Sequence, residues 1–176
     1  MSAPISKKIC MVGDFGVGKT SLIRRFVDRQ FSDQYLSTVG VKISRKMIDL
    51  SAVKPEKSEV QLLVWDIEGH TKFKAIAPTY LQGASAAVIV GDFSRQETLE
   101  RIPEHIQFFL SVNPKGLIVI ALNKSDLVDD EKLAKLILNY QFKQEKVITT
   151  YATSAKTGIY VDELFDKLAY RIIESA

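Results

Sequence analysis

Gly13-Asp14-Phe15-Gly16-Val17-Gly18-Lys19-Thr20 is the stretch of sequence that decides the fold. It fits the pattern G-x-x-x-x-G-K-[ST], in which a glycine-rich loop binds phosphate. The short apolar segment 8–12 before it predicts a buried strand, and segment 18–28 predicts a helix. Strand, loop and helix are the context that this motif requires. We therefore expect a phosphate-binding loop rather than a chance glycine-rich turn before a helix.

The residue types in this loop suit a nucleotide. Glycines allow successive backbone N–H groups to point at phosphate oxygens, and the N-terminus of the following helix adds partial positive charge there. We expect Lys19 to bind the β- and γ-phosphates and the hydroxyl of Thr20 to ligate Mg²⁺. The loop thus predicts a nucleoside triphosphate as ligand and Mg²⁺ as cofactor.

Two further segments favour guanine as the base. Asn123-Lys124-Ser125-Asp126 follows the apolar segment 116–122, at the carboxyl end of a predicted strand, where open α/β sheets bind ligands. The carboxylate of Asp126 could accept hydrogen bonds from both N1–H and the 2-amino group of guanine, a donor pair that adenine lacks. Ser154-Ala155-Lys156 again follows a strand-like segment. Three such motifs in this order predict a site for GTP and GDP.

Strand-like and helix-like segments alternate along the whole chain, which predicts an α/β fold with a mostly parallel sheet and helices on both faces. Polar residues 51–59 join two neighbouring strands and are predicted to form a surface hairpin tip. We find no repeat or linker and expect a single domain over residues 1–176. The predicted strands are 8–12, 41–50, 60–66, 84–92, 116–122 and 146–151, and the predicted helices are 18–28, 96–110, 131–140 and 160–173.

Composition excludes several classes of protein. The chain is 46% apolar and 26% charged, and its formal net charge of +3 comes from scattered lysines and arginines, which argues against nucleic-acid binding. A single cysteine, Cys10, allows no intramolecular disulfide and favours a reducing compartment, so we expect a cytoplasmic location. We also expect a monomer. No apolar run could span a membrane, and residues 171–176 hold no cysteine for prenylation. We expect no direct membrane anchor in this chain.

With these motifs in register, the chain resembles the small GTPases of the Ras superfamily, most closely the Rab branch. The resemblance covers nearly the whole chain, including segments 25–31, 38–41 and 80–84, and Asp66-Ile67-Glu68-Gly69 fits the D-x-x-G loop of the family. It implies a P-loop NTPase fold with a six-stranded sheet, one strand of which is antiparallel. It also implies effector, activator and exchange proteins as partners. They would bind through switch I (about 31–41) and switch II (about 66–80).

The resemblance assigns roles to individual residues. Phe31 would pack on the guanine ring, and the Gly69 N–H would sense the γ-phosphate. Mg²⁺ would be held by Thr20 and Thr38 directly and by Asp66 through water, and catalysis would rest on His70, Lys19 and Thr38. The nucleotide-binding residues so implied are Asp14, Phe15, Gly16, Val17, Gly18, Lys19, Thr20, Ser21, Phe31, Tyr35, Thr38, Gly69, Asn123, Lys124, Asp126, Leu127, Ser154, Ala155 and Lys156.

Four residues depart from the family pattern. His70 stands where most relatives have the glutamine that orients the attacking water, and Phe15 replaces a small residue. Glu68 replaces alanine and brings a carboxylate toward the γ-phosphate, and Ile67 replaces threonine. The 51–59 connection is also longer than the Rab norm. From His70 and Phe15 we predict slow GTP hydrolysis.

Two other functions are to be weighed. His70 and Phe15 also fit a nucleotide-held interaction module with negligible catalysis. An ATP-using kinase or ATPase is disfavoured by the motif at 123–126 and by the lack of a lid domain.

Several residues are expected to have no part in the chemistry. Cys10 is predicted to be a small buried residue, and His105 to be solvated or to cap a helix. Residues 108–110 are predicted to pack in the core. The charged cluster at 129–132 is predicted to begin a solvated helix.

Overall fold

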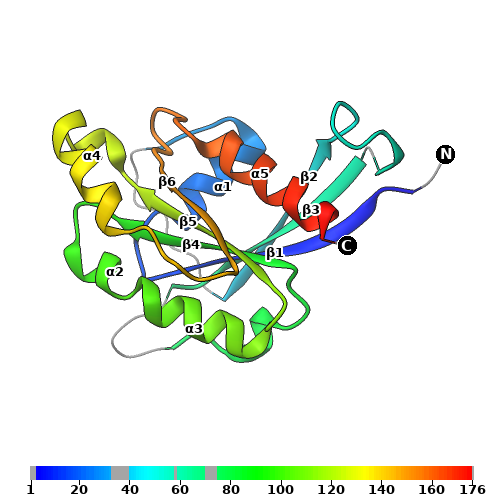
Figure 1. Cartoon of the computed structure of the whole chain (residues 1–176), viewed down its shortest axis with the longest axis horizontal. Helices are drawn as coiled ribbons and strands as arrows, with labels where there is room; N and C mark the ends of the chain where they lie inside the picture. The colour runs from blue at the N-terminus through cyan, green and yellow to red at the C-terminus, as the bar shows by residue number, and fades with distance from the viewer. Residues whose placement is uncertain (1–2, 33–39, 58, 70–74, 176) are drawn as a thin grey trace.

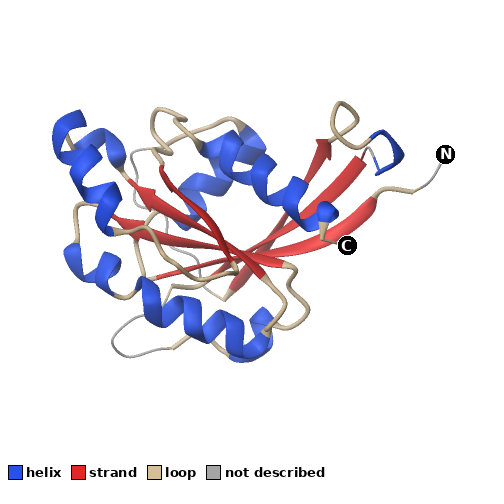
Figure 2. Cartoon of the chain, viewed as in Figure 1, coloured by secondary structure: helices blue, strands red, loops and turns tan. Residues whose placement is uncertain are grey.

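The structure, a computed structural model, describes residues 3–32, 40–57, 59–69 and 75–175. These residues form a six-stranded sheet in the order β2-β3-β1-β4-β5-β6, with helices on both faces (Figures 1 and 2). Strand β2 is antiparallel to β3, and the other neighbours are parallel. The predicted α/β fold, with its one antiparallel strand, is confirmed.

The elements follow one another much as the sequence predicts. The strands are β1 (Ile5–Gly13), β2 (Val41–Asp49), β3 (Glu59–Ile67), β4 (Ala86–Asp92), β5 (Leu117–Asn123) and β6 (Val147–Ala152). The α-helices are α1 (Lys19–Asp28), α2 (Gln96–Glu100), α3 (Ile102–Val112), α4 (Asp130–Asn139) and α5 (Val161–Glu174), and the 3-10 helices are η1 (Pro55–Lys57), η2 (Pro78–Leu81) and η3 (Ser125–Leu127).

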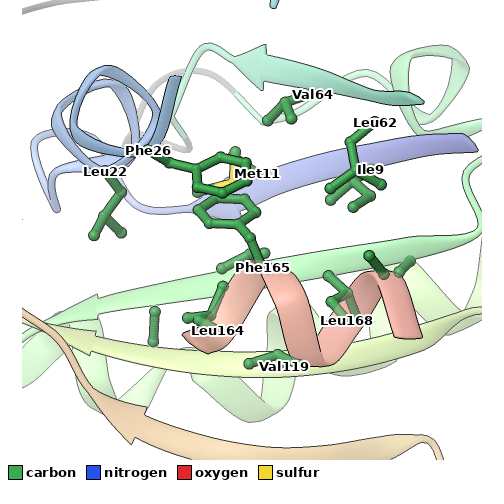
Figure 3. Packing of buried hydrophobic residues seen from close by; sticks show 14 of the residues in the cluster. Ile9, Met11, Leu22, Phe26, Leu62, Val64, Val119, Leu164, Phe165 and Leu168 are labelled. Carbon is green, nitrogen blue, oxygen red and sulfur yellow. The ribbon is translucent and has the colours of Figure 1, made fainter. Parts of the chain in front are cut away.

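Two apolar layers hold the helices to the sheet. Every residue of β4 and β5 is buried, as expected of strands that are covered on both faces. On the face covered by α1 and α5, the rings of Phe26 and Phe165 stack with their centroids 4.1 Å apart (Figure 3). On the other face, Phe109 of α3 is fully buried. This packing fixes the carboxyl ends of the parallel strands, where the three sequence motifs lie.

One predicted helix is wrong in its extent. Segment 96–110 was expected to be continuous, but the structure contains two helices, α2 and α3, separated at Arg101. Pro103 lies in the first turn of α3 and has no N–H with which to continue the hydrogen bonding of α2. The break turns the polypeptide so that α3 runs along the sheet with its own buried face.

Smaller predictions are confirmed. Cys10 is buried in β1, and burial raises the pKa of its thiol to about 12. Asp129 caps α4 by accepting from Lys132 N at 2.8 Å, and no residue of α4 is buried. The connection between β2 and β3 is a surface turn containing η1. Among the described residues, no helix has the length and apolar character needed to cross a membrane.

Candidate functional site

The phosphate-binding loop runs from the end of β1 to the start of α1. Gly18 precedes α1 as its N-cap residue, with a left-handed φ of 103°, and a Cβ there would lie 2.2 Å from Asn123 Nδ2. Only glycine fits this position. Having no side chain, Gly18 does not cap the first-turn N–H groups, and that turn contains no acidic residue. The positive end of α1 is therefore suited to an anion.

Lys19 is the buried cation of the site. Its side chain is 6% exposed, and Nζ donates to the carbonyls of Gly13 at 3.0 Å and Asp14 at 2.8 Å. Burial lowers the pKa of Lys19 to about 8, against the opposing effect of the Asp66 and Asp14 carboxylates. A desolvated ammonium group gains from an incoming phosphate, which would replace the hydration that it has lost.

Three successive carbonyls of the loop are held by side chains from β4–α2 and β5–η3. Arg95 Nη2 donates to Phe15 O at 2.5 Å, Lys124 Nζ to Gly16 O at 3.4 Å, and Asn123 Nδ2 to Val17 O at 3.1 Å. In a planar trans peptide the next residue's N–H points opposite to the carbonyl. The N–H groups of residues 16–18 therefore point away from these three side chains, which leaves them for a ligand.

Asp92 anchors two of these donors. Its carboxylate is fully buried and accepts from Lys124 Nζ at 2.7 Å, from Ser94 N at 2.8 Å and from Arg95 Nε at 3.4 Å. Burial alone would raise the pKa of Asp92, but the hydrogen bonds from Lys124 and Ser94 hold it below its ordinary value. Sequence reasoning missed Asp92 and Arg95. The signal was a carboxylate ending a wholly apolar strand.

Thr20 and Asp66 offer two oxygens suited to Mg²⁺. Thr20 Oγ1 donates to Asp66 Oδ2 at 2.6 Å, and Asp66 is 2% exposed, near the end of β3. Hydroxyl and carboxylate oxygens are the hard ligands that Mg²⁺ prefers, usually together with substrate phosphates. No cluster of three or more His, Cys, Asp or Glu that could hold a metal occurs within the described ranges. The pair thus fits a metal bound jointly with a nucleotide.

The predicted base-binding segments meet at the carboxyl ends of β5 and β6. Asn123, 2% exposed, accepts from Thr153 Oγ1 at 3.2 Å. Ser154 Oγ donates to Asp126 Oδ1 at 2.8 Å, and Asp126 itself is exposed. This bond orients the carboxylate without burying it, so Asp126 remains accessible to a base.

Arg25 of α1 binds the backbone of the 154–156 segment. Its Nε donates to Ala155 O at 2.7 Å, and its Nη2 donates to Lys156 O. The sequence motifs gave no sign of this residue. Its position two turns into α1 ties the 154–156 segment to the helix that begins at the phosphate loop.

The remaining predicted site residues differ in how exposed they are and in whether they contact the phosphate loop. Phe31 is half-buried against the core beside α1, Leu127 is 64% exposed, and Ser21 is half-buried in the first turn of α1. A Cβ on Gly69 would lie 2.5 Å from Phe15 Cα and 2.8 Å from Lys19 Nζ, so Gly69 lies against the phosphate loop. Phe15 is 40% exposed. Tyr35, Thr38 and His70 lie outside the described residues.

Glu68, the residue after β3, is bonded to Gly40, the residue before β2. Glu68 N donates to Gly40 O at 2.8 Å, and Glu68 Oε2 accepts from Gly40 N at 3.2 Å. The pair extends the β2–β3 ladder by one position beyond Val41 and Ile67. The carboxylate expected toward the γ-phosphate is thus bonded to the backbone of Gly40.

The expectation for His105 is wrong. The side chain is only 3% exposed, and Nε2 lies 3.0 Å from Asp14 Oδ1. Position 105 comes three residues after Ile102 and four before Phe109, which are both fully buried. Helical periodicity therefore places it on the buried face of α3, and this spacing was the signal that could have found it.

Comparisons with known proteins agree with this geometry. Residues 8–174 match the Ras family. The chain is 31% identical to the GTP-binding protein ypt5 of Schizosaccharomyces pombe, covering 96% of this chain and 78% of that protein. It is 33% identical to human Ras-related protein Rab-22A, covering 94% and 82%, and 34% identical to RABF2b of Arabidopsis thaliana, covering 96% and 82%. The chain therefore belongs to the Ras family of small GTPases and to its Rab branch.

Proposed function

We propose that this GTPase is a slow molecular switch that binds GTP or GDP with Mg²⁺ and signals to partner proteins through switch I (31–41) and switch II (66–80). The observation that carries the proposal is the set of donors that fixes the phosphate loop. Five successive carbonyls, from Gly13 to Val17, accept from Lys19, Arg95, Lys124 or Asn123. A loop fixed in this way is preorganised for phosphate, and its N–H groups need no rearrangement on binding.

Different residues would bind the phosphates, the base and the metal. The first turn of α1 and Lys19 would hold the phosphates, and Asp126, oriented by Ser154, would select guanine. Thr20 and Asp66 would hold Mg²⁺, which would neutralise negative charge on the phosphates. Gly69, placed against Phe15 and Lys19, would report whether the γ-phosphate is present.

The switch itself would be carried by the Glu68–Gly40 pair. Because the two loops are bonded to one another at their β-strand ends, a γ-phosphate that orders one loop restrains the other. Effector, activator and exchange proteins would read the resulting conformation. We further propose that the protein works as a monomer in the cytoplasm, an environment that suits its single buried thiol.

Slow hydrolysis is proposed from residues 15 and 70. The backbone of Phe15 lies against Gly69 and its side chain is 40% exposed, so we propose that the ring occupies space that a partner's arginine or the side chain at 70 would use. A displacement of about 1 Å at such a site costs on the order of a hundredfold in rate. A histidine at 70 has one donor and one acceptor but a different reach from glutamine.

The experiment starts from the purified protein. Its co-purifying nucleotide is identified, and GTP hydrolysis is timed under single-turnover conditions for the parent, His70→Gln, Phe15→Gly and the double variant. We expect guanine nucleotide, slow release of phosphate by the parent and faster release by the double variant. Equal or slower release by the double variant would show that the site is tuned around both residues.

The second candidate function is a nucleotide-held interaction module with negligible hydrolysis. The exposed ring of Phe15 at the nucleotide site favours it. Phosphate release within minutes, with or without a candidate activator, would exclude it.

A further inference from the structure

A buried polar cluster links α3 to the phosphate loop. Asp14 is 7% exposed, and its Oδ1 lies 3.0 Å from His105 Nε2 and 3.4 Å from Arg101 Nε. Arg101 is the N-cap residue of α3, and His105 lies one turn later on the same side of the helix. None of the three sequence motifs includes either α3 residue.

The chemistry fixes the direction of the hydrogen bond. An ionised carboxylate can only accept, so His105 must carry its proton on Nε2 and donate it to Asp14. Arg101 adds a positive charge on the same oxygen. A carboxylate this buried is costly unless it is paired and hydrogen-bonded, so Asp14 depends on α3 for its place in the loop.

The backbone of Asp14 has a second task. Its carbonyl accepts from Lys19 Nζ at 2.8 Å, beside the Gly13 carbonyl at 3.0 Å. The Asp14 carboxylate also favours the charged form of Lys19. The side chain of Asp14 is thus bonded to α3 and its carbonyl to the phosphate-binding lysine. A shift of the side chain would move the peptide that positions the ammonium group.

We propose that His105 is a positioning residue of the nucleotide site: with Arg101 it holds Asp14, and through Asp14 it holds Lys19 in place for the phosphates. The proposal rests on nucleotide binding at this loop. It makes the residence time of the nucleotide depend on α3, the helix that packs beside η2 and the end of switch II. The competing interpretation is a histidine that merely satisfies a buried carboxylate and contributes stability alone.

The test compares two variants at position 105 in the full chain. His105→Leu removes the donor, whereas His105→Gln keeps an amide N–H near the position of Nε2. Dissociation of a fluorescent GDP analogue is measured by stopped flow, and the melting temperature is measured alongside. We expect dissociation about tenfold faster in His105→Leu, the effect of losing one charged hydrogen bond, and a rate within about threefold of the parent in His105→Gln.

Two controls separate positioning from stability. Phe109 is fully buried on the same helix, and its ring offers no hydrogen bond to Asp14. Phe109→Leu should therefore lower the melting temperature while leaving the dissociation rate unchanged. Asp14→Ala combined with His105→Leu should accelerate dissociation less than the product of the single effects, because both substitutions remove the same hydrogen bond.

The outcomes are distinct. A His105→Leu variant that melts lower but releases GDP at the parental rate would overturn the proposal, and so would multiplicative effects in the double variant. Should His105→Leu fail to fold, Asp14→Ala, which removes the acceptor, must speed dissociation, and His105→Gln must remain near the parent. A parent that binds no guanine nucleotide would instead refute the proposed function itself.

Discussion

Lys19 shows at the scale of one residue how burial prepares a binding site. The fold brings its ammonium group out of water and gives it two backbone carbonyls as partners. Carbonyl dipoles compensate a buried charge only in part, and burial lowers the pKa of Lys19 to about 8. A bound phosphate favours the charged form and would raise that pKa again.

This difference predicts a pH dependence of GDP affinity. Below about pH 8 Lys19 is charged in both the free and the bound protein, so affinity is constant. Above it the free protein loses the proton that the bound protein keeps, so affinity should fall by up to about tenfold per pH unit. Equilibrium titration with labelled GDP from pH 7 to 9.5 measures this.

Lys19→Met is the control for the pH series. The variant keeps only the alkaline titration of the guanine base itself, so its affinity should be lower but flatter across pH 8 to 9. A parent whose affinity is as flat as that of Lys19→Met would contradict the role given to this lysine.

Asp126 offers a test of base selection. Asp126→Asn presents an amide N–H₂ where guanine offers donors, and xanthine offers a carbonyl there instead. We expect the preference for GTP over xanthosine triphosphate to fall by about a hundredfold or more. Competition of both nucleotides against labelled GDP gives the ratio, and an unchanged ratio would remove Asp126 from the base site.

At the residue scale, the sequence predicts the binding loops better than it predicts the single side chains that support them. The segments at 13–20 and 123–126 are runs of adjacent residues, so they can be recognised without knowing how the strands are ordered in the sheet. Arg25, Arg95 and His105 each reach the site from a helix or loop distant in sequence. The local sequence indicates at most that His105 is buried and names a partner for none of the three, because the packing of helices on the sheet decides where they point.

At the scale of elements, β2 and β3 connect the two segments that we propose as switches. β2 and β3 form a nine-residue antiparallel ladder that ends at Val41 and Ile67, and Glu68 continues it to Gly40 with both its N–H and its side chain. An alanine at 68 would retain the backbone bond alone. The Glu68 side chain therefore supplies the hydrogen bond to Gly40 N.

Removing that side chain should expose the Gly40 amide. In Glu68→Ala we expect hydrogen exchange at Gly40 to quicken by about tenfold, since one charged hydrogen bond is lost. Exchange is measured by NMR or mass spectrometry on the GDP-bound protein. Glu59→Ala, exposed at the other end of β3, is the matched control and should leave Gly40 unchanged. Equal protection in both variants would show that Glu68 does not restrain switch I.

The elements were also where sequence reasoning was least accurate. The apolar pattern of 96–110 is continuous enough to suggest one helix, although Pro103 interrupts its hydrogen bonding. In the structure the proline starts α3 instead of ending α2. The error at His105 is independent of this break, because the spacing of His105 from Ile102 and Phe109 places it on the buried face of α3 in either case.

At the scale of the whole molecule, one stacked pair of rings joins the first and last helices. Phe26 of α1 and Phe165 of α5 are each 1% exposed and stack with an interplanar angle of 11° (Figure 3). Because α1 begins at the phosphate loop and α5 follows the 154–156 segment, this contact helps to hold two parts of the nucleotide site together.

Truncating that contact should cost stability. Phe165→Ala is expected to lower the free energy of unfolding by about 3–5 kcal/mol, the usual effect of a large buried ring replaced by alanine. Urea unfolding of the GDP-bound protein measures it. Leu138→Ala, 75% exposed on α4, should change the same quantity by less than about 0.5 kcal/mol. A loss under about 1 kcal/mol in Phe165→Ala would mean that the ring pair is dispensable.

The overall architecture is predicted from the sequence more completely than single elements or residues are. Alternating apolar strands and amphipathic helices specify a layered α/β sheet, and short connections leave few ways to order it. That order brings the ends of β1, β3, β5 and β6 to one edge, so motifs scattered over more than a hundred residues meet there.

The most direct test of the switch compares hydrogen exchange of the protein loaded with Mg²⁺ and a non-hydrolysable GTP analogue against the protein loaded with GDP. The account predicts stronger protection of residues 31–41 and 66–80 in the analogue-bound form, with β4 and β5 equally protected in both, because a γ-phosphate orders only the loops that reach it. Identical exchange of both loops, with each nucleotide shown to be bound, would contradict it.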